Sequence, residues 1–286
     1  MHSPLNGIDH VVIVSDDLDH GAARYQALGF KLTPRGHHTM GTANHCAMFG
    51  DDYLELMGVP ASAQVAPAMR AFLDTAGPGL GAIALRTDDA AQAREALLAR
   101  GLDAGELRDF SRPVDLDGDT VQARFRTLDL PAGHTPGAHA FACQHYTREV
   151  AWRPGYDEHP NGVTGLDALV LVSREPQADL LRYAGLLGGD VEPDASAWRL
   201  RAPGASLLAI EPGSLDALAP GLPADARPLP YLALLRLTVQ DIARTQAVLE
   251  RNGVAFARQA GGDLLVAPAL AQGVALVFAA GVSPRP

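Results

Sequence analysis

The stretch GIDHVVIVSDDLDHGAARYQALGF, residues 7–30, decides the fold because it combines three local signals in a fixed order. IDHVVIVS is rich in β-branched residues and predicts a strand. The acidic pair that follows, Asp16 and Asp17, is typical of a helix N-cap, and Gly29 predicts where the helix ends. The same stretch places His10 inside an otherwise apolar run, where a buried imidazole needs a hydrogen-bond partner or a ligand.

The order of strand, polar cap, helix and glycine recurs three more times along the chain, from Gly79, Gly165 and Tyr231. Short strand-like segments separated by turns follow each predicted helix, so each unit has the order βαβββ. One helix covers only one face of such a sheet, and the other face must be filled or line a cavity. The units are therefore expected to pair. The sequence predicts an α+β fold of four βαβββ modules paired into two domains.

The domain boundaries follow from this repeat and from a break in composition near the middle of the chain. A segment rich in proline, glycine and charged residues separates the second unit from the third, which is typical of a linker. The predicted units are a first domain at 1–148 with modules at 7–58 and 79–147, a linker at 149–163, and a second domain at 164–286 with modules at 164–213 and 230–281.

Composition excludes several classes of function. The chain has 286 residues, of which 47% are hydrophobic and 20% charged, as in globular proteins with ample core. The formal net charge of −10 argues against non-specific binding to nucleic acid. No apolar run approaches the roughly 18 residues that span a membrane, and no secretory signal is apparent. Two distant cysteines do not suggest a disulfide framework. We therefore expect a cytoplasmic protein that binds neither nucleic acid nor membrane.

The module order and several motifs resemble the vicinal oxygen chelate superfamily, which includes glyoxalase I, extradiol dioxygenases, and fosfomycin and bleomycin resistance proteins. The motifs are DHVV at 9–12, DDLDHGAARYQALGF at 16–30, HTMGTANH at 38–45 and YLEL at 53–56, and they look like those of the glyoxalase-like subgroup. The motif resemblance covers roughly 7–147, and the second half matches only in the order of its elements. It implies two glyoxalase-like domains with half-barrel mixed sheets, and it makes a homodimer an expectation.

The resemblance also implies a metal site. Members that hold a metal use a histidine on the first strand of a module and a carboxylate on the fourth, and His10 and Glu55 match these positions. Alternation along the strand places Ile8 on the same face as His10. In the second module Ala82 stands where another histidine is expected, and Gln144 is the candidate third ligand. These ligands suit Zn, Mn, Fe or Ni as a divalent ion. A hydrogen-bonded His–Glu pair without metal is the alternative.

A second cluster of polar residues lies in PRGHHTMGTANHCAMF, residues 34–49. His38 is a candidate general acid or base, because the ordinary pKa of histidine lies near neutral pH. Thr42 and Asn44 are candidate substrate-binding residues. The alternative is that these polar side chains only satisfy backbone groups of the turn.

Three arginines, Arg112, Arg124 and Arg126, are alternatives for binding a carboxylate or phosphate of the substrate. Alternation places Arg124 and Arg126 on one face of the strand. The alternative interpretation is that this face is simply exposed to solvent. We take Arg124 as a candidate substrate-binding residue, together with His145 on a later strand.

The site is expected in the first domain, because all ten histidines lie at or before His159. The third module has Ala168 where the first has His10, so the second domain is predicted to be a degenerate copy. We expect an enzyme that binds a small organic molecule and uses the ion to polarise its oxygens, as a lyase, isomerase or dioxygenase; hydrolase chemistry also stays open. The alternative is a metal-free protein that binds a small molecule, as resistance proteins do.

Overall fold

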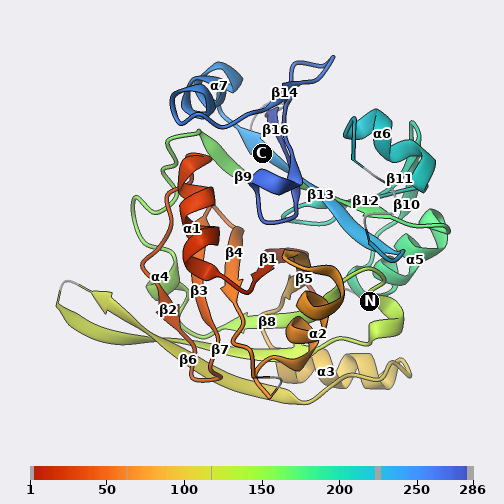
Figure 1. Cartoon of the computed structure of the whole chain (residues 1–286). Helices are drawn as coiled ribbons and strands as arrows, with labels where there is room; N and C mark the ends of the chain where they lie inside the picture. Colours follow the sequence, from red (N-terminus) through yellow and green to blue (C-terminus); the bar gives the residue numbers. More distant parts are fainter. Residues whose placement is uncertain (1–2, 63, 117, 223–226, 282–286) are drawn as a thin grey trace.

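The computed structural model describes residues 3–62, 64–116, 118–222 and 227–281. These residues form two eight-stranded mixed sheets, one in each half of the chain (Figure 1). Each sheet contains two βαβββ modules, so the predicted α+β fold of paired modules is confirmed. The predicted domain ends at 148 and 164 stay a prediction. None of the helices in the described part of the chain is long and apolar enough to cross a membrane.

The first sheet has the strand order β2-β3-β4-β1-β5-β8-β7-β6. Its strands are β1 (Ile8–Ser15), β2 (Gly36–His37), β3 (Ala43–Met48), β4 (Tyr53–Gly58), β5 (Gly79–Arg86), β6 (Leu107–Leu116), β7 (Asp119–Asp129) and β8 (His139–His145). β1 and β5 run antiparallel at the centre, and each is parallel to the last strand of its own module. The loop after β2 reaches β6, where Thr39 N donates to Ser111 O over 3.0 Å. The sheet therefore nearly closes into a barrel.

The second sheet repeats this arrangement with the order β10-β11-β12-β9-β13-β16-β15-β14. Its strands are β9 (Val163–Val172), β10 (Val191–Asp194), β11 (Ala197–Leu200), β12 (Ser206–Ile210), β13 (Tyr231–Val239), β14 (Ala257–Arg258), β15 (Leu264–Val266) and β16 (Ala275–Ala280). β9 and β13 are antiparallel neighbours, as β1 and β5 are in the first sheet. The modules thus pair within the chain, the first with the second and the third with the fourth.

In the described part of the chain, one α-helix follows the first strand of each module, and three other α-helices lie in the connections. The module helices are α1 (Leu18–Ala27), α3 (Ala90–Ala99), α5 (Pro176–Leu187) and α7 (Ile242–Arg251); the others are α2 (Pro67–Ala76), α4 (Arg148–Ala151) and α6 (Leu215–Leu218). Asp17, Asp89 and Asp241 accept hydrogen bonds from the first turns of α1, α3 and α7, as the acidic residues predicted. α5 begins with Pro176 instead and has no side-chain cap.

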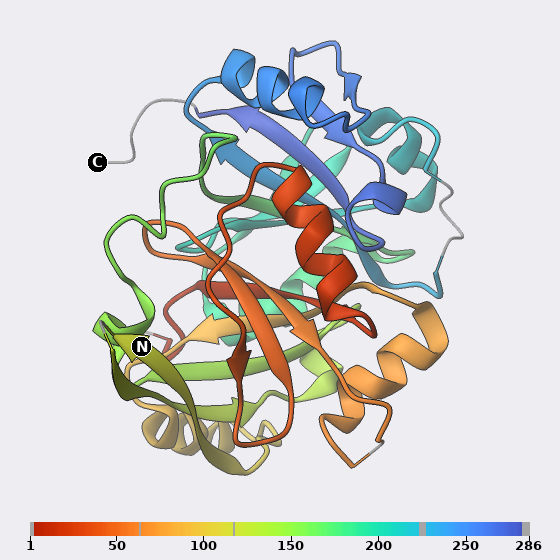
Figure 2. The same cartoon turned by 60° about the vertical axis from the view of Figure 1, so that its left-hand side comes forward.

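The two sheets share one apolar core, because the module helices pack against the opposite half of the chain. Tyr25 on α1 is fully buried and donates from its hydroxyl to Ala271 O over 3.2 Å, in the fourth module. Tyr183 on α5 makes the equivalent bond to Pro136 O over 2.9 Å, in the second module. Figure 2 shows α1 lying between the two sheets. Core contacts, rather than the linker alone, hold the halves together.

The inner face of the second sheet is filled. Strand register matches His10 and Glu55 of the first module with Ala168 and Leu208 of the third. Both of these residues belong to an apolar cluster that also contains Leu215 from α6. The second sheet therefore buries this part of its inner face against its own connections, with apolar residues at the two positions that match His10 and Glu55.

Replacing Gly204 with alanine should weaken the contact between the halves. Gly204 has a φ of +88°, and an added Cβ would lie 2.3 Å from the carbonyl oxygen of Ile8. Gly262 has a φ of +93° but open space around the added atom, so Gly262→Ala should lower the free energy of unfolding by only about 1 kcal/mol. We expect Gly204→Ala to cost about 2 kcal/mol more, because backbone must shift. Equal losses in urea denaturation would contradict this.

Candidate active site

The concave face of the first sheet encloses a cavity of about 170 Å³. Aromatic and methionine side chains form much of its wall, among them Met48, Met57, Met69, Phe110, Phe125 and Phe141. The polar side chains that line it include His10, His38, Thr42, Asn44, Glu55 and Arg112. A mainly apolar cavity with a few polar groups is the usual form of a small-molecule site.

A β-bulge at the start of β1 positions the histidine. Ile8 pairs with Leu85 on β5. His10 pairs with Ala84, the adjacent residue of β5, so Asp9 is the extra residue of the bulge. The alternation predicted from the sequence is broken here: Ile8 packs into the core between the sheets, whereas His10 lines the cavity. The side chain of Asp9 is fully buried as a result.

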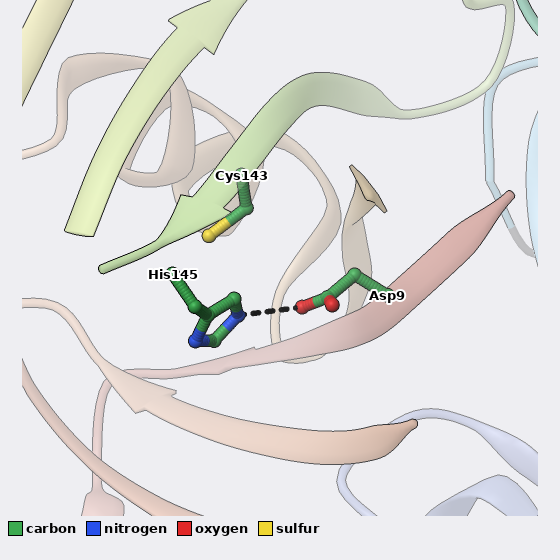
Figure 3. Close-up of side chains that lie close together, drawn as sticks. All are labelled: Asp9, Cys143 and His145. Carbon is green, nitrogen blue, oxygen red and sulfur yellow. Dashed lines mark hydrogen bonds and ion pairs between the residues drawn. The ribbon is translucent and has the colours of Figure 1, made fainter. Parts of the chain in front are cut away.

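The carboxylate of Asp9 accepts hydrogen bonds from two imidazole rings. Its Oδ2 atom accepts from His10 Nδ1 over 2.7 Å and from His145 Nε2 over 2.9 Å, the second of which is drawn in Figure 3. Burial by itself would raise the pKa of Asp9, but the hydrogen bonds from both histidines outweigh it and hold that pKa well below its usual range. Asp9 therefore stays ionised. Because a carboxylate can only accept, the proton in the bond to Asp9 is on Nδ1 of His10, and Nε2 is the ring nitrogen on the side of Glu55.

The free ring nitrogen of His10 faces Glu55. The distance from His10 Nε2 to Glu55 Oε2 is 3.6 Å, and both side chains are buried. The other carboxylate oxygen, Oε1, accepts from Asn44 Nδ2 over 2.7 Å. The ring of Tyr53 stacks on the imidazole with 4.2 Å between centroids, which fixes the plane of His10. The structure thus brings together His10, Glu55 and Asn44, three of the residues singled out in the sequence.

His38 also lines the cavity, together with Thr42. Its Nδ1 lies 2.7 Å from Thr42 Oγ1, and its ring packs edge-on against Phe110. Burial lowers the pKa of His38; the charge of Glu55 opposes this shift and that of Arg112 adds to it. His38 is therefore neutral at pH 7 and able to accept a proton.

The structure places Gln144 away from this group. Its side chain lies on the face of β8 that points to α3, where Oε1 accepts from Ala90 N over 3.1 Å. Strand register puts Phe141, rather than Gln144, at the position that matches Glu55. The geometry therefore does not support Gln144 as a third metal ligand, because Gln144 lies three residues farther along β8 than the position that matches Glu55.

A further group of ligand-type side chains adjoins His10. Asp9, Cys143 and His145 each offer one atom, and these atoms lie within 4.8 Å of one another (Figure 3). The Asp9 oxygen in this group already accepts two hydrogen bonds, and burial raises the pKa of Cys143, with the charges of Asp9 and Glu55 adding to the effect. The sequence predicts His145 as a substrate-binding residue, whereas its bond to Asp9 makes it a support for His10.

Of the three arginines considered from the sequence, Arg112 lines the cavity and is only 6% exposed. Arg126 pairs with Asp109 at the surface over 2.7 Å. Arg124 is exposed on the outer face of β7, so the geometry does not support its role in binding a substrate in this cavity. Sequence reasoning missed Asp9 as a site residue, although an aspartate directly before His10 in an apolar run was a signal for it.

Asp9→Asn should destabilise the fold and loosen His10. The amide keeps one acceptor and adds a donor that faces two imidazole N–H groups, so we expect the free energy of unfolding to fall by roughly 3 kcal/mol. The exposed Asp109, which pairs with Arg126, provides the control, and Asp109→Asn should change stability little. Urea denaturation measures both losses. An Asp9→Asn protein as stable as the wild type would show that this carboxylate does not hold the two rings.

Comparisons with solved structures agree with the fold of the whole chain. The chain resembles a hypothetical protein from Staphylococcus aureus with a TM-score of 0.69 and 12% identity, over 96% of this chain and 99% of that one. It resembles a variant of 4-hydroxymandelate synthase from Streptomyces coelicolor with a TM-score of 0.61 and 14% identity, over 99% and 94%. A xylose isomerase-like TIM barrel/4-hydroxyphenylpyruvate dioxygenase fusion protein matches with a TM-score of 0.62 and 14% identity, over 100% of this chain and 50% of the fusion.

At these identities the solved structures show a shared fold. No curated protein sequence was found to match the chain. The family of glyoxalase-like domains matches residues 8–187, which is more than half of the chain and includes the whole of the cavity-bearing sheet. The chain therefore belongs to the family of glyoxalase-like domains.

Proposed function

We propose that this protein is an enzyme that converts a small organic molecule in the cavity of the first sheet, with His10 and Glu55 as its catalytic residues. One observation carries the proposal: Nε2 of His10, whose Nδ1 is hydrogen-bonded to Asp9, lies 3.6 Å from a carboxylate oxygen of Glu55 in the wall of a mainly apolar cavity. A purely structural pair in a core would not need a cavity in front of it. Register also shows that the other three modules have apolar residues at these positions.

His10 and Glu55 have the features of two ligands of a metal site. Imidazole nitrogen and carboxylate oxygen are ligands for Zn, Mn, Fe or Ni, and bonds of about 2.0–2.2 Å to one ion are compatible with donors 3.6 Å apart. Asp9 behind His10 is the carboxylate that commonly orients a ligating histidine. We therefore propose that His10 and Glu55 hold a divalent ion. Such an ion would polarise oxygens of the substrate and stabilise an oxyanion.

The other cavity residues would orient the substrate and move a proton. Asn44 fixes one oxygen of Glu55, which leaves the second oxygen toward His10. His38, neutral at pH 7 and held by Thr42, is suited to accept a proton from the substrate and return it. Proton transfer beside a polarised oxygen is lyase or isomerase chemistry. The dioxygenase named in one structural neighbour supports oxygen-dependent chemistry as the other reaction type.

A second candidate is a metal-free protein that binds a small molecule. Ala82 and Phe141, in the second module at the positions that match His10 and Glu55, favour it. They supply no ligand atoms, whereas catalytic zinc sites usually have three protein ligands.

Elemental analysis of the purified full-length protein, after incubation with each ion and dialysis, tests the proposal. We expect about one ion per chain, and at least tenfold weaker binding in His10→Ala and in the isosteric Glu55→Gln. Gln144→Ala is the matched control and should keep its ion, because that side chain points to α3.

A protein that binds no ion, and whose thermal stability is the same with ion and with chelator, would contradict the ion and favour the second candidate. Activity toward a screened substrate that survives in both Glu55→Gln and His10→Ala would contradict the catalytic roles of these two residues.

The charge state of His38 predicts a pH dependence. Because its pKa is lower in the folded protein than in the unfolded chain, the unfolded chain binds the proton more readily below about pH 6.5. Folding stability should therefore fall as the pH drops from 7.5 to 5.5, and His38→Gln should lose less than the wild type. Urea denaturation at the two pH values measures this. An equal loss in both proteins would show that His38 has an ordinary pKa.

A further inference from the structure

Arg112 is a buried charge that the described residues leave without a counter-ion. Its side chain lies on β6, lines the cavity and is 6% exposed. Among the residues that the structure describes, it forms neither an ion pair nor a side-chain hydrogen bond. A charge removed from water without a partner is costly, and arginine does not lose its proton to avoid that cost. An anion that enters the cavity would supply what Arg112 lacks.

The other cation in the cavity wall is already paired. Arg108 lies 2.7 Å from Asp129, which also contacts His139. An anionic ligand would therefore meet one positive charge that is free to bind it, among the described residues of the wall. Guanidinium groups bind carboxylates through two parallel hydrogen bonds, which fixes the orientation of the ligand as well as its charge.

The guanidinium is held close to the polar end of the cavity. A Cβ on Gly36 would lie 3.1 Å from Arg112 Nη1 and 2.5 Å from Asn44 Oδ1, so both groups pack against the bare backbone of β2. Asn44 in turn donates to Glu55. The buried Oδ1 of Asn44 has no hydrogen-bond partner in the described part of the chain, and it is a second polar atom beside the guanidinium.

The remaining wall determines the rest of the ligand. Phe110, Phe125 and Phe141 line the cavity with the methionines, and its volume is about 170 Å³. Cavities of roughly 150 Å³ hold a molecule of the size of benzene. The ligand body is therefore apolar and about as large as one six-membered ring.

We propose that the substrate is a small carboxylic acid with an apolar, ring-sized body, and that Arg112 binds its carboxylate. This inference rests on the proposed function and names the substrate class of the same cavity. Arg112 recognises the acid, and the carbon atoms next to the carboxylate lie toward His10 and Glu55, where the chemistry is proposed to occur.

Calorimetric titration with phenylacetate and with its uncharged analogue phenylacetamide tests the assignment, because the two probes differ in charge and little in shape. In the wild type we expect the acid to bind at least tenfold more tightly than the amide. Arg112→Gln should bring this ratio close to one, while Arg112→Lys should keep part of it. Arg124→Gln is the matched control on the neighbouring strand, and its ratio should equal that of the wild type.

Thermal stability separates ligand binding from a structural role. If Arg112 awaits a ligand, Arg112→Gln should unfold at the wild-type temperature or above it, because an unpaired buried charge has been removed. A lower unfolding temperature together with an unchanged acid-to-amide ratio would show a structural role and overturn the inference. The inference would also be overturned if phenylacetate binds no more tightly than phenylacetamide, including the case in which neither binds.

The same titration in chelator-treated protein and in Glu55→Gln keeps the two proposals apart. Binding through Arg112 does not require the ion, so the acid-to-amide ratio should persist under both conditions. A ratio that depends on Arg112 when no ion binds would leave the inference standing and contradict the ion. If the protein binds the ion but shows no preference for the acid, the ion proposal stands and the inference about Arg112 is contradicted.

Discussion

The hydrogen bonds that Asp9 accepts from His10 and His145 are the interaction on which the site depends. They join β1 to β8, although β5 lies between these strands in the sheet, and so they link the two modules of the first sheet. A buried carboxylate with these two donors stays ionised, and its charge decides which nitrogen of His10 faces the cavity. The bulge at Asp9 makes this possible, because regular alternation would have turned His10 and Asp9 to opposite faces of the strand.

The two sheets show two solutions to the same constraint. A sheet covered by helices on one face must fill the other face or line a cavity with it. The second sheet fills it, with Ala168 and Leu208 at the positions that match His10 and Glu55 and with Leu215 in the same apolar cluster. The first sheet keeps a cavity and buries polar groups along it. The shared core, into which Tyr25 and Tyr183 reach from opposite halves, lets the filled domain stabilise the open one.

The modules and part of the candidate site could be predicted from the sequence. Strand and cap signals repeat four times, and period-two alternation in YLELM turns Glu55 toward the inner face, so both fold and carboxylate could be predicted. Gln144 could not be placed, because β6 and β7 are long and the register of β8 depends on tertiary pairing rather than on local pattern. Asp9 was hidden for a related reason, since one inserted residue in β1 reverses every face that alternation assigns before it.

Burying Arg112 and Glu55 in the cavity wall costs folding stability, but it leaves both side chains available to bind a ligand. Both side chains are buried. Among the described residues the guanidinium has no carboxylate within ion-pair distance, and Oε2 of Glu55 lies 3.6 Å from His10 Nε2. In the filled second sheet the position that matches Glu55 holds Leu208. Arg112 and Glu55 both line one cavity together with Asn44 and His38. This is the arrangement expected of groups whose partners arrive with the ligand, because a cavity that satisfied its own charges would have none left for recognition.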